Sequence, residues 1–410
     1  MKLCVFSDTH LGFGQDTERE QECFENVEKA LKLCFEQKAD CILLPGDVFD
    51  EAIPSQETWK ETFRVFSAVK GHAGNVSVTR VKNAREEELN VSHVPIIAIH
   101  GTHEFRGKRF ANALEVMEKA GFLFYLHAGY VEVRKGSESI AIHGLGGVPE
   151  KKALDALKSF NPVPLKGKRN ILVLHQSIKE LLPFGDEMTA SIGFDDIPKG
   201  FDLVMNGHFH LSMSQDLGDG NRFFIPGSTI ITQMKRLESE NPKGVTVFDT
   251  VTMEREFFPL LGQRRLLHET LLFENSSVGE VKVKVQKRLG ELLDMEWQLK
   301  PLVRIKLKGS LANGVSSSDI SLQEIIAPFQ GKAIISIDKD FSTGSFKKKI
   351  EELRLLQKDR KSIASIGLEL LESNLKITAF DSSIDVRELF ELLEQGKTDD
   401  VILLLSGKKK

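Results

Sequence analysis

Cysteine is scarce in this sequence, with four residues among 410 and no Cys-x-x-Cys spacing. All four, Cys4, Cys23, Cys34 and Cys41, fall within apolar patterns that are typical of a protein core. Cysteines in such patterns, away from metal-ligand spacing, behave as small core side chains. We therefore expect reduced thiols and a cytoplasmic protein, since disulfides are rare in that compartment.

Long hydrophobic runs and an excess of positive charge are also absent. No apolar run approaches the ~20 residues that a membrane helix needs. Asp8 follows Met1 too closely to leave room for the apolar segment of a signal peptide. We therefore expect no membrane partner. The formal net charge is −4, so a nucleic-acid partner has to be argued from local patches of charge.

What the sequence does contain is a series of short apolar runs that each end in Asp or His. Such runs are typical of buried strands, and sites in open α/β sheets form beyond the carboxyl ends of strands. We therefore expect these side chains to gather in one cluster. The runs and the residues that follow them are 3–5 with Asp8 and His10, 41–44 with Asp47 and Asp50, 95–99 with His103, 171–174 with His175, and 203–205 with His208 and His210.

The alternation of strands and helices predicts an α/β fold over residues 1–260. Its predicted helices are 18–37, 57–69 and 109–120, and the polar stretch 72–92 is expected to be an inserted loop. After about residue 260 the pattern changes. A helix over 278–297 and a strictly alternating strand over 302–308 predict a small α+β domain at 261–340, followed by a helical segment at 341–410.

The Asp and His side chains of the expected cluster are good ligands for divalent metals. Asp8 and His10 already pair a carboxylate oxygen with an imidazole nitrogen. The whole set offers more donors than one ion can bind, so two metals are expected, with Asp47 able to bridge them. Imidazole-rich ligation favours Mn, Fe or Zn over Mg alone. Two ions ~3.5–4 Å apart suit the hydrolysis of phosphate esters, and an unligated histidine can protonate the leaving oxygen.

The order of these motifs resembles that of the calcineurin-like metallophosphoesterases. The matching motifs are Asp8-x-His10, Gly46-Asp47-x-x-Asp50, Gly101-Thr102-His103-Glu104, His175 and Gly207-His208-x-His210. The resemblance covers residues 1–260 and implies a two-sheet α/β sandwich flanked by helices. Within that superfamily the chain looks most like the double-strand-break repair nucleases of the SbcD/Mre type, in an archaeal-like form.

This narrower resemblance implies a Mn-dependent exonuclease and endonuclease that acts on DNA ends, with two Mn²⁺ per chain, or Fe or Zn in their place. It also implies a homodimer and a partner ATPase of the SMC-like ABC class. Residues 261–340 are then a capping, DNA-binding domain, and residues 341–410 dock on the ATPase. The alternative is a phosphatase or small-molecule phosphodiesterase on the same scaffold. Glu51-Ala52 after Asp50 speaks against a phosphoprotein phosphatase, which carries a phosphate-clamping arginine there.

Carried over residue by residue, the resemblance implies a role for each member of the cluster. One metal is held by Asp8, His10, Asp47 and His210, and the other by Asp47, Thr102, His175 and His208. His103 is the general acid or stabilises the transition state without binding metal, and Asp50 orients it. Glu104 is expected as a charge beside the site. Thr102 stands where the superfamily pattern has Asn, so a DNA-end-binding scaffold with a weakened metal site is the alternative to a nuclease.

Two features beyond residue 260 point to partners. Arg304, Lys306 and Lys308 alternate with apolar residues and form a basic stripe that can contact a phosphate backbone. The alternative is the solvated face of an edge strand, where Lys is common. The apolar residues within 363–371 and 386–393 are candidates for a partner face, or for packing against the chain's own catalytic domain.

Overall fold

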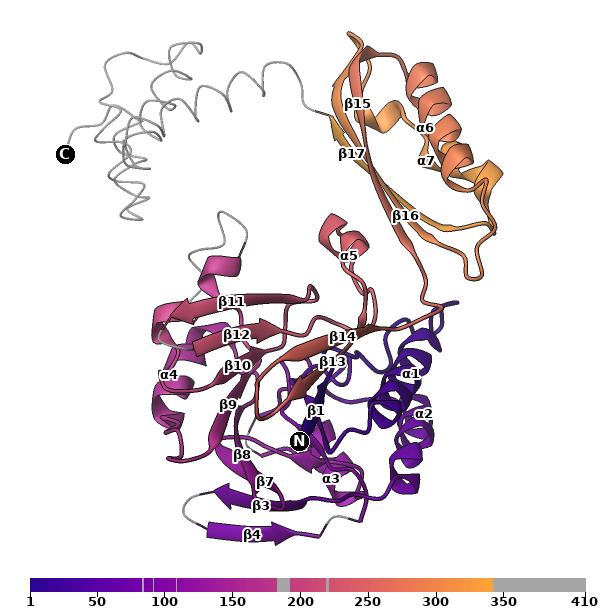
Figure 1. The fold of residues 1–410 in the computed structure, drawn as a ribbon. Coiled ribbons are helices and arrows are strands. Elements are labelled where there is room, and N and C mark those ends of the chain that lie inside the picture. Colours follow the sequence, from indigo (N-terminus) through magenta and orange to yellow (C-terminus); the bar gives the residue numbers. More distant parts are fainter. Residues whose placement is uncertain (83–84, 91, 108, 183–191, 219–220, 342–410) are drawn as a thin grey trace, which may run out of the picture. The chain divides into compact units, whose positions relative to one another are not determined.

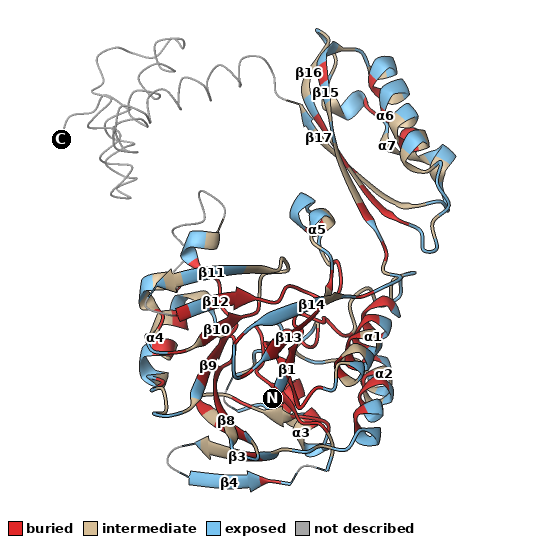
Figure 2. Ribbon diagram, viewed as in Figure 1, coloured by how far each residue is buried: buried red, intermediate tan, exposed pale blue. Residues whose placement is uncertain are grey.

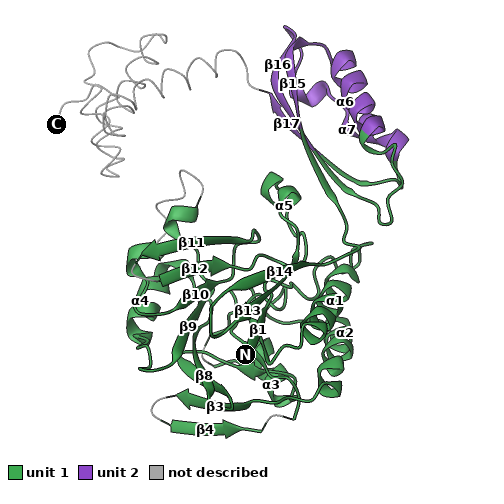
Figure 3. Cartoon of the chain, in the orientation of Figure 1, with its two compact units in different colours: residues 1–269, 292–304, 330–336 green, residues 270–291, 305–329, 337–410 purple. Residues whose placement is uncertain are grey.

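The computed structural model describes residues 1–82, 85–90, 92–107, 109–182, 192–218 and 221–341 (Figure 1). The chain forms two compact units (Figure 3). The first contains residues 1–269, 292–304 and 330–336, and the second contains 270–291, 305–329 and the described residues from 337 onward. The domain boundaries expected at 260 and 340 stay predictions. The helical segment expected at 341–410 lies, from residue 342 onward, outside the residues that the structure describes.

The first unit is built on two sheets. The six-stranded sheet has the order β14-β13-β1-β2-β5-β6. Strands β1, β2, β5 and β6 run parallel, and β13 is antiparallel to both of its neighbours, β1 and β14. Its strands are β1 (Lys2–Val5), β2 (Cys41–Leu44), β5 (Ile96–Ala98), β6 (Phe124–Tyr125), β13 (Gly244–Asp249) and β14 (Arg255–Pro259). The parallel strands all point their carboxyl ends to the same edge.

The second sheet has eight strands in the order β11-β12-β10-β9-β8-β7-β3-β4. Its central strands β8, β9, β10 and β12 run parallel. Each strand outside this group pairs antiparallel with its neighbours. The strands are β3 (Ser77–Lys82), β4 (Arg85–Leu89), β7 (Gly129–Lys135), β8 (Glu138–Leu145), β9 (Arg169–Leu174), β10 (Leu203–Asn206), β11 (Met213–Gly218) and β12 (Asn221–Ile225).

Strand alternation explains why the two sheets form a sandwich with helices outside. Leu3 and Val5 of β1 face the second sheet and share a core with Ile171 and Val173 of β9. Cys4, between them in sequence, points the other way, into the core beneath the helices. Figure 2 shows buried residues on these strands and exposed ones on the outer helix faces. The two-sheet α/β sandwich expected from the sequence is therefore confirmed.

Helices cover both outer faces. The helices α1 (Glu22–Glu36), α2 (Gln56–Phe66) and α3 (Ala113–Lys119) pack on the six-stranded sheet, and α4 (Glu150–Phe160) packs on the eight-stranded sheet (Figure 1). A short helix, α5 (Arg236–Glu240), precedes β13. The four cysteines are buried and unpaired, as expected.

The inserted loop expected at 72–92 is wrong in part. Residues 77–82 and 85–89 form the β3–β4 hairpin, which extends the eight-stranded sheet through β7. Val78 and Leu89 are buried, whereas most residues between them are exposed or half-buried. A hairpin at a sheet edge needs few buried side chains, so its sequence carries little apolar alternation.

The remaining sheet has three strands in the order β15-β16-β17. These are β15 (Leu266–Ser276), β16 (Leu302–Leu311) and β17 (Ile334–Phe341), accompanied by α6 (Val278–Leu292) and α7 (Leu322–Ile326). Val303, Ile305 and Leu307 of β16 are buried, as the alternation predicts. The α6 helix ends five residues before the predicted end at residue 297.

Within the part of the chain that the structure describes, none of the helices is long and apolar enough to cross a membrane.

Candidate metal centre

The predicted cluster forms where loops from the two sheets meet. Three groups of side chains place potential ligand atoms within 4.8 Å of one another. They are Asp8, His10 and His210; Asp47, His175 and His208; and His10, Asp50 and His103. These residues follow β1, β2, β9 and β10, together with the loop after β5. Strand carboxyl ends that share one edge place their loops together, which is why residues so distant in sequence become neighbours.

The two aspartates each join two loops and retain one oxygen for another partner. Asp8 Oδ1 accepts from the His208 backbone N–H at 3.0 Å. Asp47 Oδ1 accepts from the His103 backbone N–H at 3.0 Å. Asp8 Oδ2 is buried and has no hydrogen-bond partner among the described residues. An uncompensated buried carboxylate oxygen is costly unless a cation meets it.

The backbone at the centre is itself unusual. Asp8, His10, Asp47 and His208 have φ angles of 50°, 44°, 44° and 76°, in the left-handed region that non-glycine residues rarely adopt. Such conformations cost about 1–3 kcal/mol each and persist where surrounding contacts impose them. Here the Asp8 N–H donates to the Gly46 carbonyl at 3.2 Å, and the His10 N–H donates to the Asp47 carbonyl at 3.1 Å. Four residues of the motifs therefore share this conformation, and hydrogen bonds between neighbouring loops help to impose it on Asp8 and His10.

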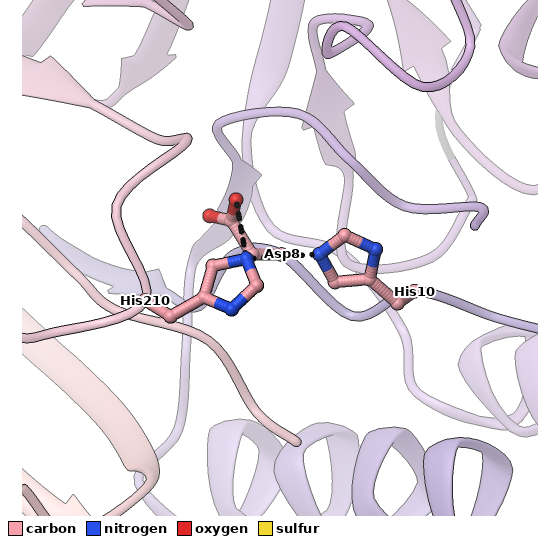
Figure 4. A group of neighbouring side chains, drawn as sticks. All are labelled: Asp8, His10 and His210. Atoms are coloured by element: carbon pink, nitrogen blue, oxygen red, sulfur yellow. Dashed lines mark hydrogen bonds and ion pairs between the residues drawn. The ribbon is translucent and has the colours of Figure 1, made fainter. Parts of the chain in front are cut away.

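The first group combines one carboxylate with two imidazoles (Figure 4). His10 Nε2 lies 3.1 Å from His210 Nε2, which lies 3.9 Å from Asp8 Oδ1. His10 Nδ1 donates to Asp50 Oδ1 at 2.9 Å, so the lone pair of its Nε2 faces His210. Two facing ring nitrogens repel unless a proton or a cation lies between them. Burial alone would lower the pKa of His10, but the Asp50 bond and nearby carboxylates raise it.

The second group centres on a buried ion pair. His175 Nε2 lies 3.0 Å from Asp47 Oδ2, and its Nδ1 donates to the Pro45 carbonyl at 2.7 Å. Burial alone would lower the pKa of His175, but the Asp47 charge raises it to about 10. Burial would also raise the pKa of Asp47, yet His175 holds it well below its usual range. His175 Nε2 makes no hydrogen bond among the described residues, so it and Asp47 Oδ2 are two neighbouring atoms that could hold a metal.

Hydrogen-bond direction fixes which nitrogen of His208 is free. Its Nε2 lies 3.0 Å from Ser177 Oγ, and that hydroxyl donates its proton to Glu150 Oε1 at 2.6 Å. The hydroxyl can then only accept from the ring, so His208 carries its proton on Nε2 and keeps Nδ1 as a ligand atom. Burial and the charge on His175 lower the pKa of His208 to about 3, which favours the neutral form that binds metals.

His103 lies beside the first group and is the most exposed of these histidines, with 44% of its side chain accessible. Its Nδ1 donates to the Asp50 backbone carbonyl at 2.6 Å, and the Asp50 carboxylate oxygen Oδ1 is 3.8 Å away. That carboxylate is closer to His10. Asp50 therefore contacts His103 through its backbone and His10 through its side chain, a division that the motif alone did not indicate.

Thr102 and Glu104 flank His103 in the loop after β5. Thr102 is partly buried, and its carbonyl accepts from the Phe105 N–H at 3.4 Å. Glu104 is fully buried and accepts from the backbone N–H groups of Phe49 at 2.7 Å and Gly101 at 2.6 Å. Burial raises its pKa to about 8, with the Asp47 charge adding to the effect. Glu104 therefore ties the loop after β2 to the loop after β5.

The residues present fit divalent metals. Each of the first two groups supplies a carboxylate and two imidazoles, a donor set suited to Mn, Fe or Zn. In each group the hydrogen bonds traced above leave ring nitrogens or carboxylate oxygens facing one another. The sequence did not reveal Ser177 and Glu150, because serine and glutamate at loop and helix starts are too common to mark a site.

The basic stripe lies on β16, which is the central strand of its sheet. The edge position expected in the alternative is therefore wrong, whereas the choice between a solvated face and a DNA contact stays open to experiment. Arg304 Nη1 donates to Ser336 Oγ at 2.6 Å, and Lys308 Nζ is 3.8 Å from Asp340 Oδ2. Arg304 and Lys306 are half-buried and Lys308 is exposed. The stripe alternates with the buried residues of β16 as expected.

Comparison of the sequence with known proteins identifies a family and several relatives. Residues 1–212 match the family described as calcineurin-like phosphoesterase. The chain is 28% identical over 275 residues to double-strand break repair protein mre-11 of Caenorhabditis elegans, covering 57% of this chain and 37% of the relative. It is 26% identical over 309 residues to double-strand break repair protein MRE11 of Mus musculus, covering 67% and 43%. It is 26% identical over 341 residues to DNA double-strand break repair protein Mre11 of Sulfurisphaera tokodaii, covering 80% and 79%. The chain thus spans less than half of the length of the two animal relatives.

Proposed function

The chain belongs to the calcineurin-like phosphoesterase family, and on that premise we propose that it is a Mn-dependent nuclease that processes DNA double-strand breaks. The observation that carries the proposal is the pair of adjoining groups, Asp8, His10 and His210 beside Asp47, His175 and His208. Two neighbouring sites of this composition suit the hydrolysis of phosphodiesters. The names of the relatives, which are double-strand break repair proteins, support DNA breaks as the substrate.

The chemistry divides between the ions and the protein. When bound, two divalent ions supply an activated water and neutralise the charge that develops on the phosphate. The first group, with Asp47, would hold one ion, and the second group, with Thr102, the other. The protein orients the ligands. Backbone N–H groups of neighbouring loops fix the carboxylates of Asp8 and Asp47, and the hydrogen bond that each histidine ring makes through its other nitrogen fixes the ring.

His103 is proposed to act on the leaving oxygen. Its Nδ1 donates to the Asp50 carbonyl, so the ring is oriented and Nε2 is the atom that can exchange a proton with substrate. The exposure of this ring allows contact with a DNA strand. General acids of this kind contribute about 10²–10⁴-fold to the rate.

DNA, a second copy of the chain and an ATPase complete the proposal. The basic stripe of Arg304, Lys306 and Lys308 is the proposed contact to the DNA backbone. The chain is proposed to dimerise through helices of the catalytic domain, with α2 and α3 as candidates. Residues 341–410 are proposed to bind an SMC-like ABC ATPase.

A substrate panel tests the function directly. The purified chain is assayed with Mn and with Mg on double-stranded ends, DNA hairpins and para-nitrophenyl phosphate esters. The proposal expects Mn-dependent cleavage of the two DNA substrates, lost in Asp8→Asn. Hydrolysis of the small esters without cleavage of DNA would favour a phosphatase or small-molecule phosphodiesterase. DNA binding without hydrolysis of any substrate would favour an end-binding scaffold.

A further inference from the structure

Behind His210, on the side away from Asp8 and His10, lies a buried ion pair that the chemistry above does not use. Glu238 of α5 and Lys243, which follows α5, are about 5% and 4% exposed, and Lys243 Nζ lies 2.9 Å from Glu238 Oε2. Buried ion pairs contribute little to stability relative to apolar residues of similar volume. Stability alone therefore does not account for an ion pair in this position.

The ring of His210 lies between the metal centre and this pair. Its Nε2 faces His10 Nε2 at 3.1 Å, as described above. Its Nδ1 lies 2.9 Å from Thr232 Oγ1 and 3.4 Å from Glu238 Oε1. A hydroxyl can donate or accept, so Thr232 is compatible with either ring tautomer. An ionised carboxylate only accepts, so Glu238 selects the tautomer that carries its proton on Nδ1.

Lys243 keeps that carboxylate ionised and in place. Its ammonium group donates to Glu238, to the His210 carbonyl at 2.9 Å and to Ser228 Oγ at 2.8 Å. Each of the three N–H bonds of the ammonium group thus has an acceptor. The bond to the His210 carbonyl fixes the backbone of that residue, and the bond to Glu238 fixes the carboxylate that faces its ring. The Gln233 N–H adds a bond to Glu238 Oε1 at 3.2 Å.

We propose that Glu238, held by Lys243, is a positioning residue for His210 that keeps its proton on Nδ1 and its Nε2 free to bind a cation beside Asp8 and His10. The inference rests on the proposed metal centre and not on the identity of the substrate. Carboxylates that accept from a metal-binding histidine orient the ring and raise its basicity, and their loss typically weakens metal binding 10–100-fold.

The test compares Mn binding to Glu238→Gln and to the wild-type chain by calorimetry, with binding to each site resolved. The expected result is a 10–100-fold weaker first site, with the second site unchanged. Glu240→Gln is the matched control, because Glu240 lies on the same helix and pairs on the exposed surface with Arg236 at 2.8 Å. Nitrogen-15 spectra of histidine-labelled, metal-free protein should show His210 losing its Nδ1–H preference in Glu238→Gln alone.

An unchanged second site in Glu238→Gln shows that the fold is intact, and a second variant separates the carboxylate of Glu238 from the nearer hydroxyl of Thr232. Thr232→Val removes the nearer hydroxyl but leaves Glu238 as an acceptor, so first-site affinity should stay within about threefold of wild type. Loss of the first site in Thr232→Val, or unchanged affinity and tautomer in Glu238→Gln, would overturn the inference and leave the proposed function standing. A wild-type chain that binds no Mn would overturn both.

Discussion

His103 differs from the other histidines of the centre in being both oriented and accessible. Its Nδ1 is fixed by the Asp50 carbonyl, whereas the side chains of His10 and His175 are 3% and 0% exposed. A buried ring that faces other ligand atoms suits metal binding. An exposed ring with one free nitrogen suits proton transfer to a bound substrate.

Replacement of His103 by alanine should therefore separate catalysis from metal binding. His103→Ala is expected to cut DNA cleavage by about 10²-fold or more, the typical contribution of a general acid. Mn and DNA binding should remain. Calorimetry with Mn and cleavage assays on the same preparation make the comparison. If the variant loses a Mn site along with activity, His103 is a ligand and the assigned role is wrong.

Thr102 is the residue that distinguishes the proposed nuclease from the alternative of a DNA-end-binding scaffold with a weakened metal site. A hydroxyl reaches less far than an amide oxygen, so the second site should bind Mn more weakly than the first, and activity should follow the weaker site because hydrolysis needs both ions. Thr102→Asn should tighten that site alone and shift the activity curve to lower Mn, with DNA binding as the unchanged control. An unaltered Mn titration would mean that Thr102 is not a ligand.

At the scale of elements, the sequence predicted the strands and loops whose formation depends on neighbouring residues in the chain. The strand–loop units that end in Asp8, Asp47 and His175 were predictable because a buried apolar run followed by polar residues is a local signal. The helix predicted at 109–120 is shorter, since the Asn112 side chain accepts from the Glu115 N–H at 3.0 Å and begins the helix there. The apolar pattern of the sequence did not predict the α4 helix, because only two of its residues, Ala153 and Leu157, are buried.

The candidate site shows the same division. Its inner groups follow motifs with fixed spacing, so the sequence predicted them together. The outer groups come from chain segments without a shared motif: Glu150 and Ser177 behind His208, and Glu238 and Lys243 behind His210. Their residue types are ordinary, and only the tertiary fold brings them to the rings they contact.

The basic stripe on β16 makes a prediction at this scale. Replacing Arg304, Lys306 and Lys308 together by Gln should weaken DNA binding and reduce its salt dependence. Each phosphate contact that is lost lowers the number of counterions that the DNA releases on binding. Lys306 should contribute more than the other two residues, because Arg304 already donates to Ser336 and Lys308 lies 3.8 Å from Asp340 Oδ2.

The control for the stripe removes the same charge elsewhere. Lys151, Lys152 and Lys158 are exposed on α4, and their replacement by Gln should leave the salt slope unchanged. Fluorescence anisotropy on a DNA duplex across a salt series measures both variants. Equal slopes for the stripe variant and the wild-type chain would show that the stripe does not contact phosphate.

For the whole molecule, the metal-centre groups lie in the first compact unit, between residues 8 and 210. The stripe lies on β16, whose residues divide between the two units. Hydrolysis, the proposed DNA contact and the proposed ATPase contact therefore depend on different stretches of sequence. Activities that occupy separate stretches should be separable by truncation.

Deletion of residues 342–410 is the corresponding prediction. The cut is placed after Phe341 because that residue ends β17 and its ring lies 5.8 Å from that of Phe273. The truncated chain should keep Mn binding and Mn-dependent cleavage of DNA ends, since its ligand groups are intact.

The truncated chain should lose capture of an SMC-like ABC ATPase in a pull-down, whereas the full chain with Asp8→Asn should keep that capture while losing cleavage. The two variants together form a reciprocal pair. Retained capture by the truncated chain would move the ATPase contact into residues 1–341, and loss of cleavage would mean that the deleted residues support the centre.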